Sequence, residues 1–427
     1  MKKSLILTFI IVFTVMLNSC KFSGLDSDTL LTPPQMNAAD REILRVLESV
    51  TSSYKLIYPK TGGYQTAITS ADIMSDDKNE AVCFYLDGNN NTVSFIILES
   101  IDNVWTIRGK YDSRASGVER VNFCDLNGDG VKEIVIGWQF LSGEEKALEI
   151  LGFGPDTAMQ SLYTGMYNNF IAFDDCVVVV SRNTTGKTAS ASLIGRLNNS
   201  VSILNTVSLN NSITGFISVQ SGQLPDSRRA IYIDEQLESL MYTTEVLIIE
   251  PQGELSRSFG TINTQSIRTR AYRCMDINGD KRLDIPVEKT FPEYVRNDVA
   301  ENLTYVEWYD YDGSSINLIT TAYTSINEQF MIKLPDEWIG NITIQRTSDT
   351  ERSVQFYYIQ QNGQLIPMFS VRVFSQQEYT DSIRNIGWDV IATSNENVYT
   401  FYSDQSELPE QYVTDITRIT DLFNLLS

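Results

Sequence analysis

The sequence predicts a mainly β fold built from repeated units, on three observations. From about Tyr54 to Thr324, short apolar runs alternate with clusters of Gly, Asn, Asp and Ser, a pattern typical of short strands and turns. Two acidic loops each lead into an apolar, β-branched run rather than a helix. Apolar runs begin, at a spacing of roughly 43 to 54 residues, just after Glu80, Glu133, Asp175, Arg229 and Asp284. This period is that of four-stranded propeller blades, so we predict a β-propeller of five to seven blades followed by a small α+β domain.

Composition limits the class of ligand and of chemistry. The chain has 427 residues, enough for two or three domains, and a formal net charge of −21. This charge argues against nucleic acid as a partner, because phosphate binding needs clustered Lys and Arg. The chain contains no histidine, which excludes Ser-His-Asp and Cys-His catalysis and imidazole zinc sites. We therefore predict that the protein is not an enzyme, although paired-carboxylate chemistry is left open.

The N-terminus is predicted to be an export signal. Lys2 and Lys3 precede a run that is apolar from Leu5 to Leu17 apart from two threonines. This run is too short for a membrane-spanning helix, which needs about 20 residues, and suits the core of a signal peptide. It ends at Leu17-Asn-Ser-Cys20, which resembles the lipobox of bacterial lipoproteins. The resemblance implies that residues 1–19 are a signal peptide and that lipid on Cys20 anchors the protein to the extracytoplasmic face of the cell membrane. Ordinary secretion is the alternative.

The remaining boundaries follow from local composition. Residues 20–36 form a polar tether that contains Pro33-Pro34. Residues 37–325 combine a helix over about Ala38–Ser53 with the propeller repeats, and residues 326–427 form the α+β domain. Exported chains can form disulfides, but four cysteines lie in or just before apolar runs and are expected in the core: Cys83, Cys124, Cys176 and Cys274.

The first acidic loop, Asp125–Glu133, has the donor pattern of a calcium site. Oxygen-bearing side chains occupy its positions 1, 3, 5 and 9, and Gly130 at position 6 allows a sharp turn. Calcium binds six to eight oxygens at about 2.3–2.6 Å, which alternate side chains and one carbonyl can supply. The predicted ligands are the side chains of Asp125, Asn127, Asp129 and Glu133 and the backbone carbonyl of Val131. An Asx-rich turn without metal is the alternative.

The second loop, Asp276–Asp284, repeats this pattern but has Lys281 where the turn glycine should be. Its predicted ligands are Asp276, Asn278, Asp280, Asp284 and the backbone carbonyl of Arg282. A degenerate third copy has Asp72, Asp76 and Glu80, with Met74 at position 3 and Asp77 at position 6. We predict structural Ca²⁺ at the first two loops.

The stretch from Phe123 to Gly137 resembles an FG-GAP or VCBS-type repeat, whose members are calcium-loop β-propellers. The resemblance carries over to the acidic positions of both loops, while Lys281 departs from the pattern. The order of lipobox, tether, helix and repeats also resembles VCBS-repeat lipoproteins of Gram-positive bacteria.

The C-terminal part is predicted to hold five strands and a closing helix over Glu407–Leu426. The aromatic stretch from Tyr305 to Gly313 is read as core and rim of a sheet, with a sugar-stacking platform as the alternative. Asp310 with Asp312, or Asp336 with Glu337, could form an acid/base pair, but sequence neighbours seldom face one substrate, so we expect neither pair to be catalytic.

These features predict a lipid-anchored, extracytoplasmic binding or scaffold protein whose ligand is a surface protein or a glycan. One alternative is a polysaccharide lyase or glycosidase that uses carboxylates in the propeller channel. A second alternative is an envelope assembly factor, which would co-purify with a membrane partner.

Overall fold

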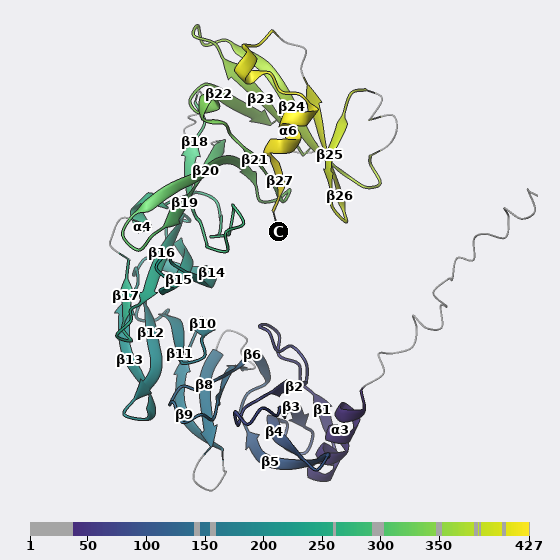
Figure 1. Cartoon of the computed structure of the whole chain (residues 1–427), viewed down its shortest axis with the longest axis vertical. Coiled ribbons are helices and arrows are strands. Elements are labelled where there is room, and N and C mark those ends of the chain that lie inside the picture. The colour runs from purple at the N-terminus through teal and green to yellow at the C-terminus, as the bar shows by residue number, and fades with distance from the viewer. Residues whose placement is uncertain are drawn as a thin grey trace, which may run out of the picture. The chain divides into compact units, whose positions relative to one another are not determined.

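The computed structural model describes residues 37–140, 146–153, 159–258, 262–292, 303–346, 352–379, 383, 386–403 and 407–426 (Figure 1). The predicted signal peptide, Cys20 and the tether lie outside these residues. The chain divides into a smaller compact unit within residues 1–120 and 153–160 and a larger one formed by 121–152 and 161–427. Within the described part, no helix is long and apolar enough to cross a membrane.

In the smaller unit a helix packs on an antiparallel sheet. The helix α3 (Ala38–Val50) begins where the Asn37 side chain accepts a hydrogen bond from the Asp40 N–H at 2.7 Å. Its apolar face buries Ile43 and Leu47 against the sheet, which confirms the predicted helix. The strands are β1 (Tyr54–Leu56), β2 (Ile68–Ala71), β3 (Glu80–Asp87), β4 (Thr92–Ile101) and β5 (Val104–Asp112). They run in the order β1-β3-β4-β5, with β2 also on β3.

Three four-stranded antiparallel sheets follow along the chain, each with its strands in sequence order. The 117–166 sheet contains β6 (Gly117–Cys124), β7 (Glu133–Gln139), β8 (Lys146–Phe153) and β9 (Met159–Met166). The 169–208 sheet contains β10 (Asn169–Ala172), β11 (Cys176–Asn183), β12 (Thr188–Leu197) and β13 (Ser200–Ser208). The 213–257 sheet contains β14 (Ile213–Gln223), β15 (Arg229–Leu237), β16 (Tyr242–Ile249) and β17 (Leu255–Arg257).

Two five-stranded sheets complete the larger unit. After the short helix α4 (Ile262–Gln265), the 285–333 sheet contains β18 (Ile285–Thr290), β19 (Thr304–Tyr311), β20 (Ile316–Ser325) and β21 (Phe330–Lys333), with β27 (Phe423–Leu425) on its edge. The 3-10 helix η2 (Asp336–Trp338) leads into the 342–403 sheet. That sheet contains β22 (Ile342–Arg346), β23 (Ser353–Ile359), β24 (Leu365–Ser375), β26 (Asn397–Ser403) and β25 (Asp389–Thr393), in that order.

Successive sheets of the larger unit share hydrophobic clusters, and this explains the apolar runs of the central strands. Side chains alternate between the two faces of a strand. Val177 and Val179 pack with residues of the 117–166 sheet, whereas Val178 and Val180 pack with residues of the 213–257 sheet. Because both faces of β11 are buried, every position from Val177 to Val180 is apolar. Antiparallel four-stranded sheets stacked face to face are propeller blades, which confirms the predicted fold class. The number of blades stays a prediction, as do the domain limits.

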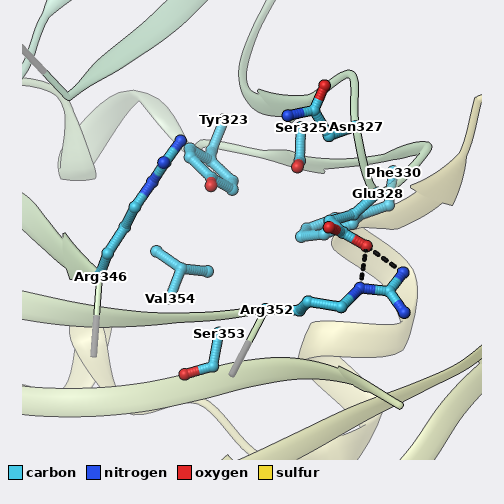
Figure 2. A pocket seen from close by; sticks show the side chains of 9 residues that line it. All are labelled: Tyr323, Ser325, Asn327, Glu328, Phe330, Arg346, Arg352, Ser353 and Val354. Carbon is cyan, nitrogen blue, oxygen red and sulfur yellow. Dashed lines mark hydrogen bonds and ion pairs between the residues drawn. The ribbon is translucent and has the colours of Figure 1, made fainter. Parts of the chain in front are cut away.

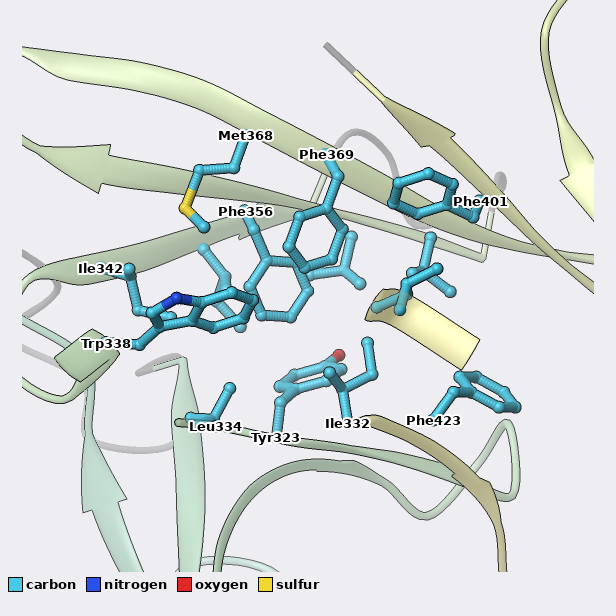
Figure 3. Packing of buried hydrophobic residues seen from close by; sticks show 14 of the residues in the cluster. Tyr323, Ile332, Leu334, Trp338, Ile342, Phe356, Met368, Phe369, Phe401 and Phe423 are labelled. Carbon is cyan, nitrogen blue, oxygen red and sulfur yellow. The ribbon is translucent and has the colours of Figure 1, made fainter. Parts of the chain in front are cut away.

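The last cluster lies between the 285–333 and 342–403 sheets (Figure 3). Phe356 and Phe369 stack there with 4.5 Å between ring centroids, and the ring of Trp338 packs on Phe369 at 5.9 Å. The cluster also takes up Ile419 and Phe423 from the C-terminal end of the chain. These two residues therefore tie the C-terminal segment to the core.

The predicted long helix over Glu407–Leu426 is wrong. The chain instead forms the 3-10 helix η3 (Glu410–Tyr412), the short helix α6 (Ile416–Leu422) capped by Asp415, and the strand β27. Valine, isoleucine and threonine are frequent here and lower helix propensity. The edge of β21 offers backbone hydrogen bonds that the chain from Phe423 onward satisfies, since Phe330 pairs with Leu425. The strands expected in this part are confirmed.

Candidate functional site

The first acidic loop folds around its own carboxylates between β6 and β7. Gly128 and Gly130 have φ of +74° and +90°, the left-handed region that glycine enters without strain. The Asp125 carboxylate accepts the Gly128 N–H at 2.7 Å and the Gly130 N–H at 3.0 Å. The Asp129 carboxylate accepts the Val131 N–H at 2.8 Å. These hydrogen bonds hold both carboxylates against the backbone of the loop.

Glu133, the last residue of this loop, is buried at 2% exposure. It accepts the Leu126 N–H at 2.7 Å, and the Asn127 side-chain amide bridges it to Asp129 at 2.7 and 3.0 Å. Burial raises the pKa of Glu133 to about 7, and the charges of Asp129 and Asp125 add to this rise. A divalent cation would remove this repulsion.

The second acidic loop has the same backbone conformation although it lacks one glycine. Gly279 and Lys281 have φ of +82° and +68°, so lysine adopts the left-handed conformation that Gly130 has in the first loop. The Asp276 carboxylate accepts the Gly279 N–H at 2.7 Å and the Lys281 N–H at 2.8 Å. The buried Asp284 accepts the Ile277 N–H at 2.9 Å. The substitution of glycine by Lys281 therefore leaves the loop intact.

Two carboxylate oxygens beside the second loop are buried without a hydrogen-bond partner among the described residues. They are Oδ1 of Asp284 and Oδ1 of Asp310. The antiparallel strands β18 and β19 pair Ile285 with Tyr309, and this register places Asp310 opposite Asp284. Burial raises the pKa of Asp284 to about 6, and the neighbouring charges of Asp280, Asp310 and Asp276 contribute. Buried carboxylate oxygens are normally satisfied, so this pair is suited to a cation.

Asp310 was not predicted at this loop. It was considered only beside Asp312, which instead accepts hydrogen bonds from the Ser314 and Ser315 N–H groups in its own turn. The Oδ2 atom of Asp310 lies 3.2 Å from the Arg282 guanidinium. Only the pairing of β18 with β19, the strands that follow the loop, could have placed Asp310 at this loop. In the first loop, Gly152 lies against the longer Glu133 side chain in the corresponding place.

The degenerate third loop shares the backbone conformation of the other two. Ser75 and Asp77 have φ of +54° and +64°, and the buried Glu80 accepts the Ile73 N–H at 2.8 Å. Met74 supplies no oxygen at position 3. The three loops are thus one structural repeat, and the third has the weakest donor set for a cation.

The metal assignments stay predictions. Within the part of the chain that the structure describes, no three His, Cys, Asp or Glu side chains gather closely enough to hold a metal ion together. In both intact loops an asparagine amide donates a hydrogen bond to the central aspartate, at 3.0 Å in the first and 3.2 Å in the second. The oxygen of the same amide accepts the N–H of that aspartate, at 2.8 Å in the first loop and 3.0 Å in the second. The donor set, all oxygen, fits a hard cation.

The predicted buried cysteines are free and buried in the structure. Burial raises the pKa of the Cys83, Cys124 and Cys176 thiols to about 12, which suits inert core residues. The aromatic stretch on β19 is also largely core, because Trp308 and Tyr311 are buried. The sugar-stacking alternative is therefore wrong for these two rings.

A polar groove that the sequence analysis missed lies where β20, β21, β22 and β23 meet. It consists of two adjoining cavities of about 440 and 300 Å³, which share Tyr323, Ser325, Asn327 and Arg346. Figure 2 shows the Arg346 side chain pointing toward Tyr323, with the Arg352–Glu328 ion pair across the cavity. The lining residues come from segments far apart in the chain, at 242, 269–272, 303–304, 323–330, 346 and 352–354, so no local sequence motif predicts the groove.

Neither a protein-family model nor a curated protein matches the chain. Among solved structures, the chain is similar to the β-propeller domain of the Trilobed protease from Pyrococcus furiosus, at 11% identity and a TM-score of 0.29, covering 75% of this chain and 90% of that one. It is similar to the Dos1 propeller at 9% identity and a TM-score of 0.27, covering 82% and 80%. It is also similar to an exo-β-1,3-galactanase from Phanerochaete chrysosporium at 9% identity and a TM-score of 0.26, covering 76% and 81%.

These comparisons correct one prediction. The chain was predicted not to be an enzyme, yet the similar structures include one, the galactanase. The exclusion is therefore wrong as stated. A likeness at 9% identity does not establish an enzymatic role either, and at such TM-scores it carries no argument about a ligand or a reaction. The β-propeller fold, assigned from the chain's own sheets, is the conclusion that stands.

Proposed function

We propose that this chain is a calcium-stabilised β-propeller that binds a surface protein or glycan outside the cytoplasm. The observation that carries the calcium part is the buried Oδ1 of Asp284, which has no hydrogen-bond partner among the described residues and lies beside Asp310. Leaving a buried acceptor unsatisfied costs about 1–3 kcal/mol, and more for a charged group. A bound cation would remove this cost.

The residues of both loops fit calcium by their chemistry. Each loop offers two aspartates, one asparagine oxygen, one backbone carbonyl and a buried final carboxylate. The residues that would hold the ion are Asp125, Asn127, Asp129, Val131 and Glu133 in one loop and Asp276, Asn278, Asp280, Arg282 and Asp284 in the other. An ion that binds only the folded chain stabilises it by about 2.7 kcal/mol at a concentration of 100 Kd. The resemblance to FG-GAP and VCBS repeats supports the same assignment.

The test is thermal unfolding of the chain from Lys21 onward, in calcium and in chelator. We expect the melting temperature to rise by several degrees with calcium. Replacing Asp125 and Asp129 with alanine should remove the part of the rise due to the first loop, and replacing Asp276 and Asp280 should remove the rest.

Asp312→Ala is the matched control. Asp312 also holds a turn through its carboxylate, but within a single Asx turn with no second acid. Its loss should lower the melting temperature equally in calcium and in chelator. If the melting temperature of the unmodified chain is the same in calcium and in chelator, the calcium assignment is refuted.

We also propose that lipid on Cys20 anchors the protein to the extracytoplasmic face of the membrane. The support is the lipobox-like Leu17-Asn-Ser-Cys20 after a short apolar run. Cys20→Ala should move the protein from the membrane pellet to the soluble fraction. Continued pelleting of this variant would overturn the anchoring proposal without affecting the calcium assignment.

A further inference from the structure

The polar groove of the larger unit has the size and lining of a small-ligand site. Its two cavities, of about 440 and 300 Å³, each lie within the usual range of about 300–1,000 Å³ for a ligand pocket. Its walls come from β20, from the end of β22, from the start of β23 and from the segment 269–272. The second cavity is lined by hydroxyl and amide groups, among them Thr269, Thr304, Ser325 and Asn327, and by the apolar side chains of Leu303 and Ile326.

Three arginines line this groove in a chain whose net charge is −21. Two of them are already paired: Arg352 with Glu328, and Arg270 with Glu288 at 2.8 Å. Arg346 is exposed and has no hydrogen-bond or ion-pair partner among the described residues. The guanidinium of Arg346 is thus the cation available to an incoming anion, and its flat fork of donors matches a carboxylate.

Tyr323 gives the groove a rigid wall opposite Arg346. Its ring packs edge-on against Phe356 at 5.7 Å between centroids and lies 6.0 Å from Phe330. Burial raises the pKa of Tyr323, and the charges of Arg346 and Arg270 oppose the rise, so both guanidinium groups act at the phenol. On the second wall the Tyr272 hydroxyl donates to the Thr324 carbonyl at 3.2 Å. Both walls are therefore held in place by contacts within the protein.

We propose that this groove binds an acidic saccharide, with a uronate carboxylate on Arg346 and the sugar hydroxyls on the hydroxyl- and amide-bearing wall. The inference rests on the proposed binding function and names its ligand class. The rings of Tyr272 and Tyr323 are buried, at 3% and 8% exposure, so they support the wall from behind and the sugar would be held by polar contacts rather than by stacking. Arginine clusters also recognise acidic peptides. The hydroxyl and amide groups beside Arg346 favour the saccharide, because they can bind the several hydroxyls of a sugar.

The experiment is isothermal titration of the chain from Lys21 onward with trigalacturonic acid. The carboxyl-reduced, neutral form of the same trisaccharide tests the need for the carboxylate, and triglutamate tests the peptide alternative. The variants are Arg346→Gln, which removes the free cation, and Arg41→Gln, which makes the same charge change on the exposed face of α3. Circular dichroism checks that each variant is folded.

We expect trigalacturonic acid to bind the unmodified chain and the Arg41→Gln variant equally. Binding to Arg346→Gln should be weaker by at least about tenfold, since a charge-assisted hydrogen bond contributes about that much. The neutral trisaccharide should not bind. The inference is overturned if trigalacturonic acid does not bind, if Arg346→Gln binds it unchanged, or if triglutamate binds as tightly.

The titrations are run in calcium and repeated in chelator. A calcium-dependent melting temperature without trigalacturonate binding would refute the ligand class and leave the calcium assignment standing. Binding that is the same in chelator as in calcium would support the groove independently of the loops.

Discussion

Arg268 and Asp234 form an ion pair in the interior of the larger unit, with 2.8 Å between the guanidinium and Oδ1 and side-chain exposures of 0% and 1%. The other oxygen of Asp234 accepts the Cys274 N–H at 2.9 Å, and Arg268 also donates to the Tyr272 carbonyl. The pair therefore ties β15 to the irregular segment that leads into the second acidic loop.

Asp234→Ala should destabilise the protein by about 3–5 kcal/mol, because it leaves the Arg268 charge buried without its partner. The measurement is the free energy of unfolding in urea. Replacing both residues with apolar ones, Asp234→Leu with Arg268→Met, should recover part of the loss. A loss of less than about 1 kcal/mol for the single variant would contradict the pairing.

The metal-free protein should become more stable as the pH falls from about 8 toward 5. Glu133 and Asp284 have folded-state pKa values of about 7 and about 6, both above the ordinary carboxyl values. The folded chain thus binds more protons than the unfolded chain in this window, so stability is lost as the pH rises through these pKa values. Melting temperatures in chelator across this pH range test the sign.

Saturating calcium should abolish or reverse that pH dependence, since the ion holds both carboxyls deprotonated. In chelator, Glu133→Gln should flatten the slope. A slope that is the same in calcium and in chelator would mean that these carboxyls do not face a cation.

Glu235→Gln should stabilise the protein at pH 8 and have little effect at pH 4. Both carboxylate oxygens of Glu235 are buried without a hydrogen-bond partner among the described residues. Burial, with the charge of Glu245 beside it, raises the pKa of Glu235 well above its usual value. Stability is therefore lost as the pH rises from the ordinary carboxyl pKa through the folded-state value, and glutamine removes this loss.

Unfolding of the Glu235→Gln variant in urea at both pH values is the measurement. The matched control is Glu238→Gln, a change in the same hairpin at a side chain that is 54% exposed. We expect the control to leave the pH dependence of stability unchanged. Equal effects of Glu235→Gln at pH 4 and pH 8 would contradict the burial argument.

Lys281→Gly should raise the stability of the chain by about 1 kcal/mol. Lys281 has φ of +68°, and a non-glycine residue in this region costs about 1–2 kcal/mol, part of which the greater freedom of glycine in the unfolded chain offsets. The measurement is the melting temperature in chelator. Gly130→Ala in the first loop is the reverse test and should be destabilising, because Gly130 has φ of +90°.

The acidic loops were predictable from sequence because their structure is local. The loop carboxylates accept N–H groups within seven residues of themselves, as Asp125 does from Gly128 and Gly130 and Glu133 does from Leu126. The central strands of the blades were predictable because their burial appears in the sequence as an apolar run. For example, neighbouring sheets cover both faces of β11, so its residues must be apolar on both faces. These features predicted the fold class and the candidate loops.

The tertiary structure decided what depends on segments far apart in the chain. Asp310 joins Asp284 only because β18 and β19 pair in one register, and a shift of one residue would turn it to the other face of the sheet. Arg346 and Tyr323 line one cavity only because the 342–403 sheet packs against the 285–333 sheet. Phe423 leaves the helical pattern because β21 has an edge to pair with. By itself the sequence determined strands, turns and loops through local hydrogen bonding and alternation. Strand register and sheet packing, which involve residues distant in sequence, determined the groove and the added carboxylate.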